Sequence, residues 1–407
     1  MSPQAPVLSQ PQLIDAARRF GTPLYVYHAE RIAWQYGRLA RAFSGCDARF
    51  FYACKSLTNL NILRYVLRLG ANLDCVSLNE VRLGLMAGFP PERILFTPNC
   101  TDFEEYAAAV ELGVRINIDS LPILDRFGER YAGTRHVCIR LNPHILAGGN
   151  LKISTGHAHS KFGISVEQID EVREVVRARG MRVEGIHMHT GSDIKEVGVF
   201  LGGLELMLRM SAHFPELAFI DLGSGFKVPY RPGDPETDIE LLGLRVSEAF
   251  DRHAIATGRR LQAWFEPGKF LVSECGYLVV KANLVKRTPA DVFVGVDSGF
   301  NHLIRPMFYE AYHEIENITH PDGAPHPYTV VGNICETDTF ATGRMLPEVR
   351  EGDLLVFRNA GAYGFEMSSR FNSRCRPAEV LYLDGEARLI RRREEFDDLL
   401  RGQVEVL

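Results

Sequence analysis

Eight short apolar segments recur through the first two-thirds of the sequence, and each ends near Gly, Pro, Asn, Asp or Ser before an amphipathic stretch. Their interiors are rich in Val, Ile, Phe and Leu without strict alternation, which is typical of strands covered on both faces. Eight strands alternating with helices over about 220 residues predict an α/β fold with a (β/α)8 TIM barrel, because a doubly wound sheet seldom needs eight uniform units. The segments begin at residues 48, 71, 93, 114, 135, 182, 216 and 260.

Helical periodicity fills the intervals between these segments. Apolar residues at 60, 63, 66 and 67 fall on one helical face, as expected for an amphipathic helix packed on a barrel. Asp102 and Ser165 each stand where a helix N-cap residue is expected, with acidic residues following. Further helices are expected near residues 81–86, 103–112, 120–132, 166–180, 197–213 and 239–258.

From about residue 285 the pattern changes to short strands separated by turn residues, which predicts a mostly antiparallel β domain resembling a barrel or sandwich. The segment PLYVYH at 23–28 has the same character, so we expect it to join that domain. The sequence therefore predicts a barrel at 36–285 and a discontinuous β domain made of 1–35 and 286–407.

The charge and the apolar content of the sequence indicate which kinds of partner the protein can bind. The 407 residues include 46 Lys and Arg against 51 Asp and Glu, a net charge of −5, which argues against a protein that coats nucleic acid or an anionic membrane. No run of 18 apolar residues is present, and the first residues lack the pattern of a secretion signal. We therefore expect a cytoplasmic protein with neither a nucleic-acid nor a membrane partner. The eight cysteines include no CxxC pair, so we expect no disulfides, no zinc knuckle and no thioredoxin-like site.

Residues able to do chemistry stand at the predicted strand ends, where barrel enzymes place their active sites. Lys55 follows a largely apolar strand; it is either a surface lysine or a desolvated amine able to form a Schiff base. The turns Gly223-Ser224-Gly225 and Glu266-Pro267-Gly268 follow the seventh and eighth strands, whose loops often bind phosphate. Glu266 is either a solvated loop acid or a carboxylate that keeps a pyridine nitrogen protonated.

Two histidines, His187 and His189, lie two residues apart on one predicted strand. This spacing suits a metal pair and leaves a metal-dependent hydrolase as an alternative. Such an enzyme needs further ligands that the other strand ends do not supply as a set, so the favoured interpretation makes His187 structural and gives His189 a ring-stacking role.

In the β domain, three peptides at 305–313, 333–340 and 359–369 are too polar for a simple core. Tyr363 stands between glycines; it is either a turn aromatic or a donor to a phosphate. Cys335 and Glu336 are either a buried thiol beside a loop acid, or a proton donor beside an anchor for a substrate ammonium group.

Seven motifs, in this order along nearly the whole chain, resemble the diaminopimelate decarboxylases, which are fold-type III enzymes that use pyridoxal 5'-phosphate. That group also contains ornithine and arginine decarboxylases and alanine racemase. The segment STGHAHSKFGI at 154–164 also resembles the family's loop over the active site. The motifs are FYACKS, HMHTGSD, LGSGF, EPGK, RPMFYEAYH, ICETDTF and GAYGFEMSS.

The resemblance implies a role for each matching residue. Lys55 holds the cofactor covalently, His189 stacks on its ring, Glu266 binds its ring nitrogen, and Cys335 donates a proton. In the family, Cys335 and Glu336 complete the active site of the other subunit of a homodimer. The implied cofactor-binding set is Lys55, Asp74, His189, Ser192, Gly223, Ser224, Gly225, Glu266, Gly268 and Tyr363. The implied substrate-binding set is Lys269, Arg305, Tyr309, Glu336 and Tyr363.

Two departures from the family pattern stand out. Ser224 occupies the middle of a triplet that is usually Gly-Gly-Gly, and its amide can still bind phosphate. Lys269 stands where Arg is common after EPG, and Lys keeps the charge but cannot copy a bidentate clamp on a carboxylate. The exact substrate is therefore less constrained than the type of reaction.

The implied reaction converts meso-2,6-diaminopimelate to L-lysine and carbon dioxide in lysine biosynthesis. Arg305 favours this substrate, because a decarboxylase for ornithine, lysine, arginine or carboxynorspermidine would prefer acids at the distal pocket. A racemase using Cys335 as a second base and a noncatalytic vitamin B6 carrier are the remaining alternatives.

Overall fold

The computed structural model describes residues 5–145 and 155–407. The chain forms two compact units. The barrel unit contains Gln35–Val228 and Pro235–Leu271, and the β unit contains Met1–Trp34, Pro229–Asp234 and Val272–Leu407.

Eight parallel strands close the barrel unit, which confirms the predicted TIM barrel. Each strand pairs with the next in chain order, and the last pairs with the first: Ala263 of one is in register with Ala48 of the other. A two-residue strand, β7 (Ile164–Ser165), adds to the edge of β6. The barrel strands are β2 (Ala48–Ala53), β3 (Asn72–Cys75), β4 (Ile94–Phe96), β5 (Arg115–Ile118), β6 (His136–Asn142), β8 (Arg182–His187), β9 (Phe219–Asp221) and β10 (Gln262–Phe265).

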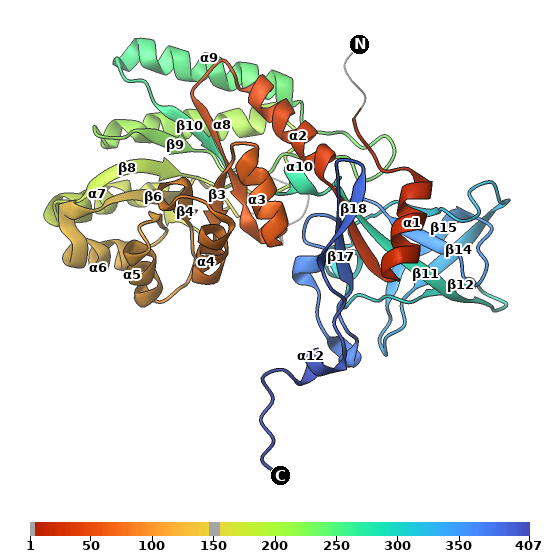
Figure 1. The fold of residues 1–407 in the computed structure, drawn as a ribbon. Helices are drawn as coiled ribbons and strands as arrows, with labels where there is room; N and C mark the ends of the chain where they lie inside the picture. The colour runs from red at the N-terminus through yellow and green to blue at the C-terminus, as the bar shows by residue number, and fades with distance from the viewer. Residues whose placement is uncertain (1–4, 146–154) are drawn as a thin grey trace. The chain divides into compact units, whose positions relative to one another are not determined.

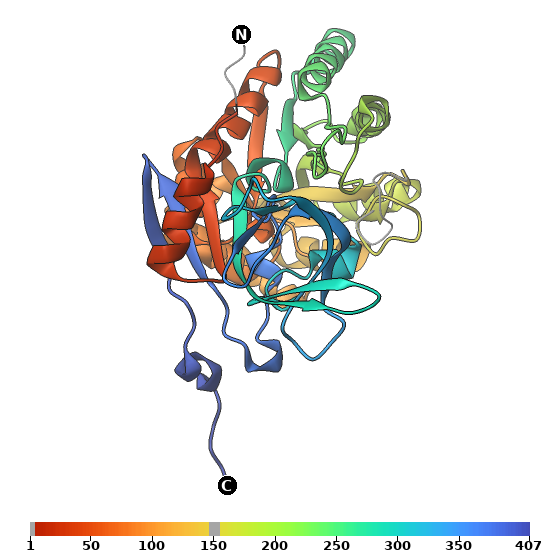
Figure 2. The same ribbon diagram turned by 90° about the vertical axis from the view of Figure 1, so that its right-hand side faces the viewer.

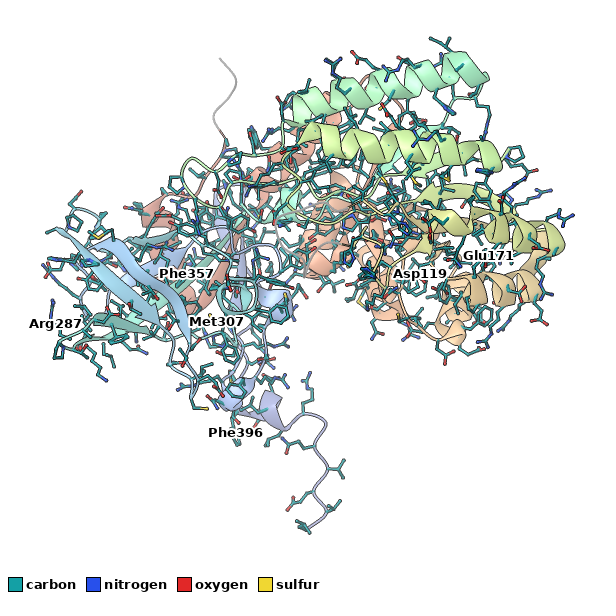
Figure 3. The ribbon with its side chains drawn as sticks, turned by 180° about the vertical axis from the view of Figure 1, so that it is seen from behind. Asp119, Glu171, Arg287, Met307, Phe357 and Phe396 are labelled. Carbon is teal, nitrogen blue, oxygen red and sulfur yellow. The ribbon has the colours of Figure 1, made fainter. Side chains whose placement is uncertain are left out.

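Amphipathic helices cover the outside of the barrel (Figure 1). Asp102 caps its helix by accepting a hydrogen bond from the Glu104 amide, as predicted. In Figure 3, Asp119 lies among the barrel strands, whereas Glu171 lies on the outer helix α7. The helices are α2 (Ala29–Ala42), α3 (Leu60–Arg68), α4 (Leu78–Ala87), α5 (Phe103–Glu111), α6 (Leu121–Tyr131), α7 (Ile169–Ala178), α8 (Val197–Met210), α9 (Ile239–Thr257) and α10 (Lys269–Val272).

Stacked aromatic rings fill part of the barrel interior. The rings of Phe219 and Trp264 are nearly parallel, with centroids 3.4 Å apart, and Phe51 packs against Trp264 at 4.4 Å. A Cβ on Gly185 would lie 2.1 Å from the Phe219 ring. Glycine in β8 therefore makes room for this stack, and the stack holds β9 and β10 together below the strand ends that carry the chemistry.

The β unit is built on a nine-stranded mixed sheet, in which β1 pairs with β11 antiparallel and with β17 in parallel. The segment 23–28 therefore lies inside this sheet. The sheet is mostly antiparallel as predicted, but β1–β17 and β12–β14 are parallel; long connections between them permit this direction. The strands are β1 (Leu24–His28), β11 (Gly276–Arg287), β12 (Val292–Val296), β13 (Ile315–Asn317), β14 (Pro325–Val331), β15 (Thr339–Pro347), β16 (Leu354–Phe357), β17 (Ala378–Leu383) and β18 (Glu386–Arg391).

The core of the β unit lies between this sheet and the helix α1 (Gln10–Phe20). Leu13 and Ala16 of α1 are buried against a cluster that includes Val26 and Val279. The strands coloured teal to blue curve around a common core in Figure 2. Two short helices, α11 (Arg305–Tyr309) and α12 (Phe396–Leu400), complete the unit.

Two further observations concern the cysteines and the lengths of the helices. All eight cysteines are free, and Cys54, Cys75, Cys138 and Cys275 are buried. Among the described residues, no helix combines the length and the apolar character needed to cross a bilayer.

Candidate active site

The strand ends bring Lys55 next to Asp74. Lys55 lies in a single turn directly after β2, and its Nζ is 3.7 Å from Asp74 Oδ2 at the end of β3. The Lys55 side chain is 40% exposed, whereas that of Asp74 is 1% exposed. The amine can therefore be reached from solvent while a buried carboxylate holds it from one side.

The turn that carries Lys55 is fixed by local hydrogen bonds and by close packing. Ser56 Oγ donates to the Ala53 carbonyl at 2.6 Å, and the Tyr52 hydroxyl donates to the Leu57 carbonyl at 3.0 Å. A Cβ on Gly268 would lie 2.2 Å from Ser56 Oγ. Glycine after β10 thus lets the last loop of the barrel pack directly against the lysine turn.

Glu266 is a buried carboxylate at the end of β10. His187 Nε2 lies 3.2 Å from Glu266 Oε2, and both side chains are almost fully buried. Burial raises the pKa of Glu266, and the positive charges of Lys55 and Arg140 oppose that rise. Among the described residues, no donor lies within hydrogen-bond distance of the other oxygen, Oε1. That oxygen remains available to accept a hydrogen bond.

Asp221 places a second carboxyl beside Glu266. Asp221 ends β9, and its Oδ1 accepts a hydrogen bond from the Gly223 amide at 2.9 Å. Ligand atoms of His187, Asp221 and Glu266 all lie within 4.8 Å of one another. Burial and the charge of Glu266 raise the pKa of Asp221 well above its usual range. The close approach of these two carboxyls disfavours ionisation of both together.

Arg140 of β6 supplies a buried positive charge. Burial lowers its pKa, and the carboxylates of Glu266, Asp119 and Asp74 oppose that effect, in decreasing order. Its guanidinium also lies over the Phe162 ring, 4.7 Å from the centroid. The sequence interpretation did not single out Asp221. Arg140 and Asp221 could both have been found in the sequence, because each is a charged residue in an otherwise apolar strand.

His189 is held as a neutral ring beside the glycine turn. The Ser224 amide donates to His189 Nδ1 at 3.4 Å, so Nδ1 carries no proton. Burial, followed by the charges of Lys55 and Arg140, lowers the pKa of His189 well below its usual value. Thr155 Oγ1 donates to the His189 carbonyl at 2.7 Å, so part of the segment 154–164 contacts this strand end. Residue 154 lies outside the described residues.

Glycine is required at the turn after β9. Gly223 and Gly225 have φ of 61° and 95°, a region that favours glycine. A Cβ on Gly223 would lie 2.5 Å from His189 Nδ1, and one on Gly225 would lie 2.3 Å from the Gly191 carbonyl. The turn therefore passes directly over the strand end that carries His189.

The segment after His189 carries Ser192 and then Asp193. Ser192 is partly buried. Lys269 Nζ lies 2.7 Å from Asp193 Oδ1, and the Lys269 side chain is only 9% exposed. The lysine that replaces the family's usual arginine is therefore joined to a carboxylate in the turn that follows His189.

The predicted substrate residues of the β unit lie on three segments. Arg305 begins α11 and is buried, with its guanidinium carbon 5.4 Å from the centroid of the Tyr230 ring and 5.8 Å from that of Tyr309. Met307 of the same helix is labelled in Figure 3. Tyr363 is partly buried and has a φ of 56°. Cys335 and Glu336 are both exposed between β14 and β15, so the alternative of a buried thiol at Cys335 is wrong.

Comparisons with known proteins now decide between the chemical alternatives. A family model described as "Pyridoxal-dependent decarboxylase, pyridoxal binding domain" matches residues 29–273. A diaminopimelate decarboxylase of Methanothermobacter thermautotrophicus is 40% identical over 400 residues, which cover 96% of this chain and 93% of that protein. The Escherichia coli K12 diaminopimelate decarboxylase is 36% identical over 416 residues, covering 97% and 96%. The chain belongs to the diaminopimelate decarboxylase family.

Solved structures agree with this family assignment. The crystal structure of the Helicobacter pylori diaminopimelate decarboxylase complexed with L-lysine matches with a TM-score of 0.88 at 30% identity, covering 96% of this chain and 98% of that one. A lysine/ornithine decarboxylase from Vibrio vulnificus has a TM-score of 0.81 at 23% identity and shows the fold alone.

The residues present fit pyridoxal phosphate, the cofactor of the diaminopimelate decarboxylase family. Lys55 offers an accessible amine for its aldehyde, and Glu266 Oε1 offers a buried acceptor for a protonated ring nitrogen. The metal alternative lacks its expected ligand pair: of the two histidines, only His187 belongs to the buried cluster with Asp221 and Glu266. The alternative of a metal-dependent hydrolase is therefore not supported.

Proposed function

We propose that this chain decarboxylates meso-2,6-diaminopimelate to L-lysine and carbon dioxide, with one proton taken up for each bond broken. The observation that carries the proposal is the pairing, at one barrel rim, of an accessible Lys55 amine with a buried Glu266 oxygen that has no donor among the described residues. The family assignment supports the same reaction, since relatives of 34–40% identity over nearly the whole chain are diaminopimelate decarboxylases.

When bound, pyridoxal phosphate supplies an electron-withdrawing ring that takes up the electron pair of the breaking Cα–carboxylate bond. Lys55 would hold the cofactor through its side-chain amine, which is open to the solvent side. Glu266 holds a proton at the ring nitrogen. His189, whose pKa is lowered by burial, would stack on the ring without adding a positive charge. The turns that contain Gly223–Gly225 and Gly268 would hold the phosphate. Asp74 and Ser192 complete the cofactor-binding set.

The substrate roles in this proposal are those that the family resemblance implies for the matching residues. Arg305 binds the distal carboxylate, helped by Tyr309, and Glu336 binds the distal ammonium. Tyr363 would donate a hydrogen bond to the phosphate and would border the substrate. Cys335 protonates the α-carbon after carbon dioxide leaves. Cys335 and Glu336 act in the partner subunit's site, which makes the enzyme a homodimer; that assembly and a cytoplasmic location stay predictions.

Arg305 separates this substrate from the basic amino acids. Ornithine, lysine and arginine carry no distal carboxylate, so a buried guanidinium facing their distal end would be opposed by like charge. Its Nε has no hydrogen-bond partner among the described residues, which leaves donor capacity for a substrate anion. Lys269 keeps the positive charge of the usual arginine.

The test compares carbon dioxide release by the purified holoenzyme from meso-diaminopimelate, L-lysine, L-ornithine and L-arginine. We expect release from meso-diaminopimelate alone. Release from ornithine but not from meso-diaminopimelate would refute the substrate assignment. Arg305→Met should raise KM for meso-diaminopimelate, because the variant keeps the length of the side chain and loses the charge.

Three controls test the assigned roles. Borohydride should fix the cofactor to the peptide that contains Lys55, and Lys55→Ala should lose both this adduct and turnover. Cys335→Ala should slow turnover far more than it weakens cofactor binding. A protein that binds zinc and shows no visible cofactor band would contradict the proposal.

A further inference from the structure

Cys335 is held by a residue that lies far from it in the sequence. The Cys335 amide donates to Asn372 Oδ1 at 2.8 Å, and Asn372 Nδ2 donates to Cys335 Sγ at 3.1 Å. One side chain thus contacts both the backbone and the sulfur of the same cysteine. Both residues are exposed, so packing in a buried core does not force these two hydrogen bonds to form.

The backbone around Asn372 is shaped to present this side chain. Asn372 has a φ of 56°, and Ser373 has a φ of 54°, a left-handed conformation that asparagine tolerates better than most residues. The Phe371 ring stacks on Phe300 with centroids 5.4 Å apart. Arg374 Nη2 donates to the Asn333 carbonyl at 3.1 Å. The segment 371–374 is therefore anchored on both sides of the asparagine.

The loop that carries Cys335 is fixed at its base by Asp338. The Phe300 amide donates to Asp338 Oδ1, and the Gly332 amide donates to the Asp338 carbonyl, both at 2.7 Å. A Cβ on Gly332 would lie 1.8 Å from Asp338 Oδ2, so this closure requires glycine. Because these hydrogen bonds fix the base of the loop, the conformational freedom that remains is near Cys335. Asn372 forms its two hydrogen bonds at that position.

We propose that Asn372 is a positioning residue for Cys335, and that its Nδ2 stabilises the thiolate left after proton transfer. This inference rests on the proposed role of Cys335. In that step the S–H bond breaks, a C–H bond forms at the substrate α-carbon, and the sulfur keeps the electron pair until water returns a proton. A hydrogen bond to an ionised sulfur is stronger than one to a thiol, so the Nδ2 donor assists the transfer.

Two substitutions separate the two hydrogen bonds of Asn372. Asn372→Asp keeps an oxygen for the Cys335 amide but replaces the donor to the sulfur with a carboxylate. Asn372→Gly retains the left-handed backbone and removes both bonds. Ser373→Gly is the matched control, because Ser373 is an exposed neighbour with the same backbone conformation. Glu336, Asp338 and Arg374, the charged residues of the two segments, are unchanged in every variant.

Two measurements on the holoenzyme read out the effect. The first is the rate of iodoacetamide alkylation of Cys335 by mass spectrometry, with the exposed Cys100 as an internal reference. The second is the separation of kcat from KM for meso-diaminopimelate. We expect Asn372→Asp and Asn372→Gly to lower both the alkylation rate and kcat by about tenfold or more. KM, Cys100 alkylation and the Ser373→Gly enzyme should change little.

The alkylation rate and kcat of the Asn372→Asp variant test the role of the Nδ2 donor. If Asn372→Asp restores wild-type alkylation and kcat while Asn372→Gly does not, Asn372 only holds the backbone and the proposal is overturned. Unchanged alkylation in both variants overturns it as well. If Cys335→Ala retains full activity, the role of Cys335 in the proposed function fails, and the alkylation rates still report whether Asn372 acts on the sulfur.

Discussion

Asp74→Asn is expected to make the apoenzyme more stable and the enzyme less active. Asp74 is 1% exposed, and its pKa is raised from 3.8 to about 6 by burial and by the charge of Glu266, against the opposing charge of Lys55. The folded apoenzyme, in which Lys55 carries a free amine, therefore binds a proton at Asp74 more tightly than the unfolded chain does. Ionising this carboxyl costs the fold free energy.

The magnitude follows from the size of the pKa rise. A rise of about 2 pH units at about 1.4 kcal/mol each amounts to about 3 kcal/mol. Because the folded-state pKa is the higher one, the free energy of unfolding falls as the pH rises from about 4 to about 6 and is level above that. Asparagine resembles the protonated carboxyl, so the variant lacks this fall. The variant should be more stable by about 3 kcal/mol at about pH 7.5 and by about half of that at about pH 5.

Thermal unfolding of the apoenzyme at these two pH values is the assay. For a unit of this size, about 3 kcal/mol corresponds to a rise in Tm of about 6–12 °C. Asp251→Asn, at an exposed position in α9, controls for the loss of one negative charge. Equal stability of wild type and Asp74→Asn at the higher pH, or a gap that does not widen between the two values, would refute this reasoning. Turnover should fall, because the variant loses the carboxylate 3.7 Å from Lys55.

Three further substitutions test the barrel rim, and a fourth, in helix α8, is a control. Glu266→Gln keeps the shape of a buried side chain but loses the charge that holds a proton at the ring nitrogen, so kcat should fall by about a hundredfold or more with cofactor retained; an absorbance titration and initial rates measure this. Gly225→Ala adds a Cβ at a φ of 95° and 2.3 Å from a backbone carbonyl, which should cost about 1–3 kcal/mol and weaken cofactor retention. Gly202→Ala, in open space on α8, should be neutral or stabilising in the same melting experiment. Asp193→Asn removes the carboxylate 2.7 Å from the largely buried Lys269 and should lower Tm by the equivalent of about 1–3 kcal/mol; an unchanged Tm would show that this ion pair adds nothing.

The sequence by itself determined the barrel, and its resemblance to a known family indicated the type of chemistry. Apolar runs and helical periodicity are local properties, so the eight strands around Phe51, Ile116 and Phe265 were predictable from their own segments. Position at a strand end also singled out Lys55 and Glu266, because a closed parallel barrel brings all such ends to one rim.

Only the tertiary structure decided which of these residues act on one another. The contacts of Asp221 with Glu266 and of Asn372 with Cys335 join segments tens of residues apart, and no periodicity in either segment encodes its partner. The same holds for Arg140, whose charge has meaning only among the carboxylates that burial gathers around it. Local patterns fix where a strand begins and ends, whereas pKa values and hydrogen-bond partners depend on distances that exist only once the chain has folded.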